Sequence, residues 1–182
     1  PDLSPQDQAR ARLMLGRLLA TTAPRDYRQA MDETVAAIKL AAAQVNRGEP
    51  GLRGPARQLL IDAELSLSEI LAYGPWKQKH EVIPQWLVTA EKAANEYIEK
   101  DGGPRRVLLS VYGTSLHCLL VLNGQGTPDN IAEAAIQLGR DLIAEVEDDD
   151  HRAAIECQLG TALRYAAQVA QRKGDTESAL QY

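Results

Sequence analysis

The stretch HCLLVLNGQGTPDNIAEAA (117–135) fits two different folds. Its apolar run enters Gly124-Gln125-Gly126 and a helical pattern follows, which is the order of strand, glycine loop and helix that holds a dinucleotide phosphate. The same letters also fit the end of one helix, a turn and the start of the next. The first interpretation predicts a cofactor enzyme, whereas the second predicts a helical scaffold.

A second stretch of the chain favours the helical interpretation. The letters AQRKGDTESAL (170–180) align with VLNGQGTPDNIAEAA (121–135) and have no strand character. The dinucleotide fingerprint requires a third glycine at position 129, where the carboxylate of Asp129 would repel a pyrophosphate. Asp129 or Thr127 instead suits the start of a helix, where an acceptor side chain is favourable. We therefore expect no cofactor.

The composition also favours helices. Hydrophobic residues make up 45% of the 182 residues but aromatic residues only 4%, with no Phe, so the core must consist of Leu, Ile, Val and Ala. Alanine and leucine are strong helix formers because they lose little side-chain entropy in a helix. The sequence therefore predicts an all-α fold.

Charge and hydropathy exclude several classes of protein. A net charge of −5 argues against binding to nucleic acid, because neutralising phosphates requires a basic excess. The sequence contains neither an apolar run of membrane-spanning length nor a basic-then-apolar leader, so we expect no membrane association. Cys118 and Cys157 are too few for a disulfide scaffold, and they lie in apolar helical patterns, which suggests a reducing, cytoplasmic location.

Six of the nine prolines stand before long stretches with helical periodicity, and proline is favoured in the first turn of a helix. We expect each of the six to mark a helix start. Glycines follow several of the stretches, where they can form left-handed caps. The starting prolines are Pro5, Pro24, Pro55, Pro84, Pro104 and Pro128, and the expected helices span about 5–22, 25–46, 55–73, 84–100, 104–123, 128–147, 151–173 and 175–182.

The helices form pairs that repeat along the chain. Three stretches, at 15–31, 112–135 and 159–180, share a glycine after a large residue, an apolar run, a turn and a polar first turn that ends at alanine. The spacing of Gly16, Gly113 and Gly160 corresponds to a period of about 48 residues, with Glu64 or a neighbour at the glycine position of the second repeat. Such a period is typical of a helical solenoid. We expect one array over 1–182, with repeats at about 4–48, 52–101, 103–148 and a truncated 149–182.

These motifs resemble those of tetratricopeptide (TPR) repeat proteins. The resemblance rests on Gly160, Gly174, Asp175 and Ala179 in one repeat and on Gly113, Gly126 and Ala134 in another. The period is longer than the usual TPR length of about 34 residues. It is similar to long-repeat variants in bacterial multidomain proteins, where the arrays stand beside a nucleotide-driven switch domain or a caspase-like protease. The resemblance implies a right-handed superhelix of about four antiparallel helical hairpins that binds proteins or peptides.

The last repeat is incomplete. Its second helix ends after DTESALQY (175–182), about two turns, although a terminal repeat needs a polar cap or a following repeat to cover its apolar face. We expect the native chain to continue beyond Tyr182, or this hairpin to self-associate.

No pattern in the sequence predicts catalysis or a metal site. His117 and Cys118 are neighbours on a helix and point about 100° apart, so they cannot form a nucleophile and base pair. His80-Glu81 begins like a zinc-protease helix, but Pro84 stands where the second histidine belongs. The acidic run 145–150 lacks the spacing of a calcium loop and fits a solvated turn before a helix. We therefore expect this chain not to be an enzyme.

The residues that suit a partner are polar positions on the first helix of each pair. Arg17, Thr114 and Thr161 each follow a motif glycine, and His117 and Arg164 lie one turn farther along the same face. They predict a mildly basic groove for an acidic protein or peptide segment, with solvated surface residues as the alternative. A further candidate is Trp76, in the basic loop 74–80, which either contacts a partner or folds back onto Trp86.

The sequence thus predicts a protein-binding scaffold of a larger bacterial protein. The alternative is a regulatory part of an enzyme whose catalytic domain, a caspase-like protease or a nucleotide-driven switch, lies outside these residues.

Overall fold

A computed structural model describes residues 3–48, 51–122 and 128–182, and within these ranges the chain is helical and forms no strand. The prediction of an all-α fold is therefore confirmed for the described residues. The helices are α1 (Pro5–Thr21), α2 (Tyr27–Arg47), α3 (Arg53–Tyr73), α4 (Lys79–Asp101), α5 (Val107–Val121), α6 (Pro128–Glu145), α7 (Asp149–Lys173) and α8 (Thr176–Gln181).

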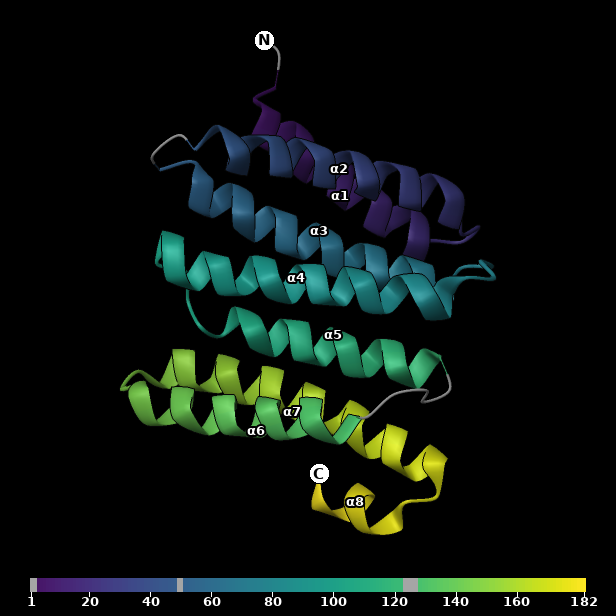
Figure 1. The fold of residues 1–182 in the computed structure, drawn as a ribbon, viewed down its shortest axis with the longest axis vertical. Helices are drawn as coiled ribbons and strands as arrows, with labels where there is room; N and C mark the ends of the chain where they lie inside the picture. The colour runs from purple at the N-terminus through teal and green to yellow at the C-terminus, as the bar shows by residue number, and fades with distance from the viewer. Residues whose placement is uncertain (1–2, 49–50, 123–127) are drawn as a thin grey trace. The chain divides into compact units, whose positions relative to one another are not determined.

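The helices belong to two compact units, unit 1 (1–104) and unit 2 (105–182). In unit 1, α1 packs against α2, α2 against α3 and α3 against α4, and α1 also contacts α3 (Figure 1). In unit 2, α5 packs against α6 and α7, and α7 also contacts α6 and α8. Within each unit, contact of each helix with the next, and of α1 with α3 or α5 with α7, is compatible with a helical repeat. The single array over 1–182 stays a prediction.

The spacing of the elements is compatible with the expected period. The second helices of the pairs, α2, α4, α6 and α8, begin at residues 27, 79, 128 and 176, which are 48 to 52 residues apart. One hydrogen bond between the first helices of neighbouring pairs, from Gln158 of α7 to Ser110 of α5, joins residues 48 apart. This contact therefore joins similar positions of the two pairs.

The helix ends follow local signals in the sequence. Ser4 Oγ accepts the amide N–H of Asp7 at the start of α1, and Asp26 accepts that of Gln29 at the start of α2. Each bond satisfies an N–H that has no partner within the helix. The glycines Gly48, Gly102 and Gly174 end α2, α4 and α7 in the left-handed conformation, as expected for glycine caps.

One expected helix start is wrong. Pro84 lies inside α4, which begins at Lys79 rather than at residue 84. The amides of Glu81 and Val82 donate to the Gln78 carbonyl and form the first turn ahead of the proline. A proline at this position removes the hydrogen bond to the carbonyl four residues earlier, which here is His80 in the first turn, where the helix adapts more easily than in its interior.

The core consists of the residue types that the composition predicts. In unit 2 it is built from leucine, isoleucine and alanine. Alanines let the helices approach closely, while the leucines fill the space between them. Its buried members are Leu109, Leu116, Ala132, Ala135, Leu138, Leu142, Ile155, Ala162 and Ala166. In the part of the chain that is described, no helix is both long and apolar enough to cross a lipid bilayer.

The motif glycines differ in what surrounds them, which gives a matched test. A Cβ atom at Gly16 would lie 2.4 Å from Thr34 Oγ1 and 3.0 Å from the Ala30 carbonyl oxygen of α2, whereas a Cβ at Gly160 meets no atom within 4 Å. We expect Gly16→Ala to lower the free energy of unfolding by about 1 to 3 kcal/mol through overpacking. Gly160→Ala should raise it by about 0.5 to 1 kcal/mol, because alanine costs less entropy in a helix. Urea unfolding followed by circular dichroism would measure both changes, and equal effects would contradict this reading of the α1–α2 contact.

Candidate partner-binding face

Helices α5 and α7 share a polar side within unit 2. On α5, Ser110, Thr114 and His117 recur at intervals of three or four residues and are half-buried. Such spacing places them on one side of the helix. We define the α5/α7 face as these three residues together with the residues of α7 at matching spacing, which are Thr161, Arg164, Tyr165, Gln168 and Arg172.

Polar contacts hold the two helices in register along this face. The side-chain amide of Gln158 donates to Ser110 Oγ at 3.4 Å, and a guanidinium N–H of Arg172 donates to the Leu120 carbonyl. Between these two contacts, the His117 ring stacks on the Tyr165 ring, with centroids 4.6 Å apart and planes 4° from parallel. The side chains on the face are therefore positioned by neighbours on both helices.

Arg164 lies beside the aromatic pair. Its Cζ atom is 5.0 Å from the centroid of the Tyr165 ring, within the range of a cation–π interaction, and the residue is exposed to solvent. The ring limits the positions of the guanidinium while its N–H groups stay accessible, which suits recognition of a carboxylate. Two predicted residues, His117 and Arg164, thus meet at Tyr165.

Sequence reasoning missed Tyr165, although a signal was present. Tyr165 comes directly after Arg164, the residue that the repeat aligns with His117. Side chains near equivalent positions of neighbouring repeats can come into contact when repeats stack. The register of the repeat thus indicated the neighbourhood of this contact, and the packing of α5 against α7 decided that Tyr165 makes it.

The two predicted threonines contribute differently. Thr161 is exposed, and its hydroxyl donates to the Cys157 carbonyl of its own helix at 2.9 Å. Such a bond to the preceding turn leaves the oxygen able to accept another hydrogen bond. Thr114 is half-buried, one turn before His117.

A shallow hollow of about 340 Å³ continues the face toward the end of α7. It is lined by Leu120, Gln168, Gln171 and Arg172. Glutamine side chains offer both donors and acceptors, so they can bond to the peptide groups of an extended segment. The hollow therefore adds main-chain recognition beside the positive charge.

Arg17 belongs to unit 1, in contrast to the other candidates on the first helices. Its Nε donates to Ser66 Oγ at 2.8 Å and its Nη2 donates to the Asp62 carbonyl oxygen at 3.3 Å, which joins α1 to α3. Burial raises the pKa of the Asp62 carboxyl, and the positive charge of Arg17 offsets part of this effect. Arg17 thus has a structural role within unit 1, and a groove shared with the residues of unit 2 stays a prediction.

Trp76 folds back onto the end of α3. Its ring lies so close to Gly74 that a Cβ atom there would be 1.6 Å from ring atom Cζ3. Only glycine leaves room for the indole at this position. The side chain is half-buried, and the expected packing of Trp76 against Trp86 stays a prediction.

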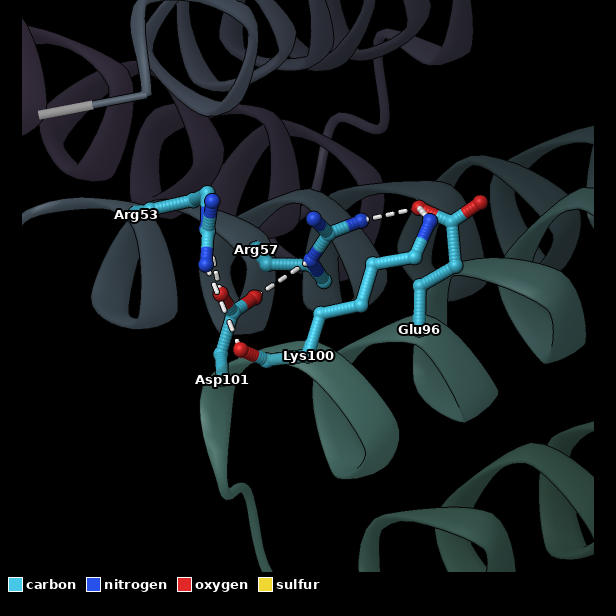
Figure 2. A network of polar contacts seen from close by, with 5 residues as sticks. All are labelled: Arg53, Arg57, Glu96, Lys100 and Asp101. Atoms are coloured by element: carbon cyan, nitrogen blue, oxygen red, sulfur yellow. Dashed lines mark hydrogen bonds and ion pairs between the residues drawn. The ribbon is translucent and has the colours of Figure 1, made fainter.

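A network of hydrogen bonds and ion pairs joins α3 to α4 (Figure 2). Arg57 donates to Asp101 Oδ2 at 2.6 Å and also to Glu96, while Arg53 donates to the other oxygen of Asp101. The side chains of Arg57 and Asp101 are 7% and 4% exposed. Burial acts to raise the pKa of Asp101, but the hydrogen bonds from Arg53 and Arg57 outweigh it and hold that pKa below its usual value. Because its charges are already paired, we regard the network as structural.

A second buried carboxyl, that of Glu64 on α3, lacks the arginine hydrogen bonds that offset burial at Asp101. Glu64 is 3% exposed, and its Oε2 atom has no hydrogen-bond partner among the described residues. Burial raises the pKa of Glu64 to about 7. Glu64 stands at the position that corresponds to Gly16 in the repeat and lies seven residues, or about 10 Å, along α3 from Arg57. The guanidinium of Arg57 is engaged elsewhere, so it does not compensate this carboxyl.

The remaining sequence candidates show no clustering that suits a metal or a nucleophile. Within the described ranges, no three or more His, Cys, Asp or Glu side chains come together as a metal-binding group. Cys118 is buried, as expected for a core residue, whereas Cys157 is exposed. In the acidic run, Asp148 accepts the Asp150 amide at the start of α7 and contacts the His151 ring, as expected for a helix-capping acid.

Comparison with protein-family models gives no match. Neither curated proteins nor solved structures contain a match to this chain. We therefore base the functional conclusion on the chemistry of the α5/α7 face.

Proposed function

We propose that the protein is a TPR-like scaffold that uses the α5/α7 face to bind an acidic, extended segment of a partner protein. The observation that carries this proposal is the exposed Arg164 guanidinium held at the Tyr165 ring, which itself stacks on His117. A positioned arginine loses less entropy when it binds a carboxylate than a mobile one does.

The charge of the face supports an acidic ligand. Arg164 and Arg172 lie on it, and the residues that define it include no acid. Unit 2 as a whole carries eleven acidic against seven basic side chains, so the face differs in sign from its surroundings. An acidic segment would be attracted to this face and repelled by most other surfaces of unit 2.

The length of the face supports a short extended segment. Thr161 and Arg172 are eleven residues apart on α7, which corresponds to about 16 Å along the helix axis. This distance is spanned by about five residues of extended chain. The alternation of hydroxyl, guanidinium and amide groups along it can satisfy both carboxylates and peptide groups. The proposed role is binding rather than catalysis.

We expect reversal of the two arginines to abolish this recognition. An array of acidic hexapeptides, with basic hexapeptides of matched length beside it, would supply the ligands for the unmodified protein. The double variant Arg164→Glu and Arg172→Glu should weaken binding of the best acidic peptide by at least about tenfold, because attraction becomes repulsion. The exposed residues Arg106 and Arg140 provide the control, since their reversal to glutamate changes the net charge equally.

The two double variants separate local recognition from a general effect of charge. Equal losses in both would mean that overall charge governs binding, and unchanged binding in the first would show that the α5/α7 face is not the site. A preference of the unmodified protein for the basic peptides would also contradict the proposal. Chemical-shift changes in NMR spectra should centre on His117 and Tyr165.

A further inference from the structure

Helix α1 is apolar on two opposite sides. Ala9, Leu13 and Gly16 are buried in unit 1. On the other side of the helix, apolar residues recur with helical spacing and are exposed to solvent. We define this outer stripe as Ala11, Met14, Leu15 and Leu18, of which the last three are 59%, 40% and 58% exposed.

The equivalent positions of α3 show what normally covers such a stripe. One period of 48 residues later stand Leu59, Asp62, Ala63 and Ser66. Leu59, Ala63 and Ser66 are 7%, 0% and 4% exposed, and Asp62 is half-buried. On α3, these positions are therefore covered, whereas the corresponding positions on α1 are exposed.

The hairpin of α1 and α2 supplies this cover for α3. Arg17 of α1 donates to Ser66 and to the Asp62 carbonyl, whereas Arg57 reaches α4 from the opposite side of α3. In unit 1, both α1 and α2 pack against α3. The outer stripe of α1 thus corresponds to the side of α3 that a neighbouring hairpin covers.

Helix α8 has the features of a helix that would dock there. It begins after Asp175, which accepts the amide of Ser178, as Asp26 accepts that of Gln29 before α2. In this alignment Leu180 corresponds to Met31 of α2, the helix that packs on α3. Met31 is half-buried, whereas Leu180 is 84% exposed.

Charge selects this partner over a second copy of α1. Helix α1 carries Arg10, Arg12 and Arg17 against one acid, Asp7. Arg12 is paired with Glu33 and Arg17 donates to α3, so Arg10 is the arginine beside the outer stripe. Two α1 helices facing each other would bring two Arg10 side chains together, whereas α8 brings Glu177 in its first turn. Arg10 is exposed one turn before Met14, where an acid of a docked helix could reach it.

We propose that the outer stripe of α1 binds the α8 end of a second copy of this chain, head to tail. Such a contact joins two different surfaces, so a dimer keeps one free outer stripe and one free α8 end, and further copies can be added. Its small apolar area places it among weak interfaces, with association expected only at high protein concentration.

Two charge substitutions test the proposal. Leu18→Glu places a carboxylate in the outer stripe, and Leu180→Glu places one on α8. Both residues are largely exposed, so neither variant should unfold the protein, which circular dichroism would verify. The matched control is Val88→Glu on α4, because Val88 is 65% exposed and lies outside both surfaces.

Sedimentation equilibrium at concentrations up to about 1 mM measures the weight-average mass, and this range detects weak association. We expect that mass to rise with concentration for the unmodified chain and for Val88→Glu, and to remain that of a monomer for each of the other two variants. An equimolar mixture of Leu18→Glu and Leu180→Glu should form a dimer and nothing larger, because it retains one intact stripe and one intact α8.

Several outcomes would overturn the proposal. One is an unmodified chain that stays monomeric throughout the concentration range. Another is a Leu180→Glu variant that associates as the unmodified chain does, which would point to contact between two α1 helices. A mixture that stays monomeric would equally exclude the head-to-tail pair. Peptide binding at the α5/α7 face uses different residues, so its success or failure is independent of these results.

Discussion

Replacement of Arg57 by methionine should lower the free energy of unfolding by about 3 kcal/mol, because it leaves the buried Asp101 with only one of its two arginine partners. Methionine fills a similar volume and retains the apolar stem, so the change reports mainly on the charge and its hydrogen bonds. The substitution also removes the hydrogen bond to Glu96 that joins α3 to α4 (Figure 2).

The pair of Arg12 and Glu33 provides a control on the surface. Its N–O distance is 2.7 Å, but the two side chains are 47% and 20% exposed. Arg12→Met should therefore change the free energy of unfolding by less than about 1 kcal/mol. Both tryptophans lie in unit 1, so urea unfolding followed by tryptophan fluorescence reports on the helices concerned. Comparable effects in the two variants would contradict the assigned role of burial.

The network should also give unit 1 a characteristic dependence on low pH. Burial acts to raise the pKa values of Asp101 and Glu96, but both lie below their usual 3.8 and 4.5. Hydrogen bonds from Arg53 and Arg57 lower the pKa of Asp101, and Arg57 together with Lys100 lowers that of Glu96. A lowered pKa stabilises the folded state above the unfolded-state pKa, and this contribution is lost as the pH falls. In Arg57→Met, less of this stabilisation remains to be lost, so its difference from the unmodified protein should shrink in acid.

Replacement of Glu64 by methionine should, in contrast, raise the free energy of unfolding at neutral pH. The pKa of Glu64 rises from 4.5 to about 7 on folding because the carboxyl is buried. The folded state therefore holds a proton that the unfolded state releases, and stability is lost as the pH rises from about 4.5 to about 7 and then levels off. The shift corresponds to about 3 kcal/mol above pH 7, which the methionine variant would recover.

The difference between the Glu64→Met variant and the unmodified protein isolates this group, because other titrating residues affect both alike. Urea unfolding at several pH values between 4 and 8, followed by tryptophan fluorescence, would give that difference. Glu64→Gln is the matched variant that stays polar but cannot ionise, and it should remove the same pH dependence with a smaller gain in stability. A difference that stays constant with pH would show that Glu64 does not titrate on folding.

The sequence identified most of the local structure but not the contacts that give side chains their roles. His117 and Arg164 could be placed on helix faces, yet their meeting at Tyr165 depends on how α5 packs against α7. Glu64 was assigned to a glycine position, but nothing in the sequence indicated a carboxyl buried without a partner. Arg57 and Asp101 carried no motif, because ion pairs between helices have no fixed local pattern.

Helix class and capped ends were determined by the sequence alone, since they depend on propensity, periodicity and hydrogen bonds within a few residues. Pro84 led to a wrong prediction only of where α4 begins. The tertiary structure alone decided which faces are covered. Leu18 and Ser66 hold equivalent positions, and the leucine is exposed while the serine is buried. The physical reason is that burial depends on a packed helix that lies tens of residues away in the chain. Helical periodicity marks the apolar faces of a helix but does not indicate which of them another helix covers.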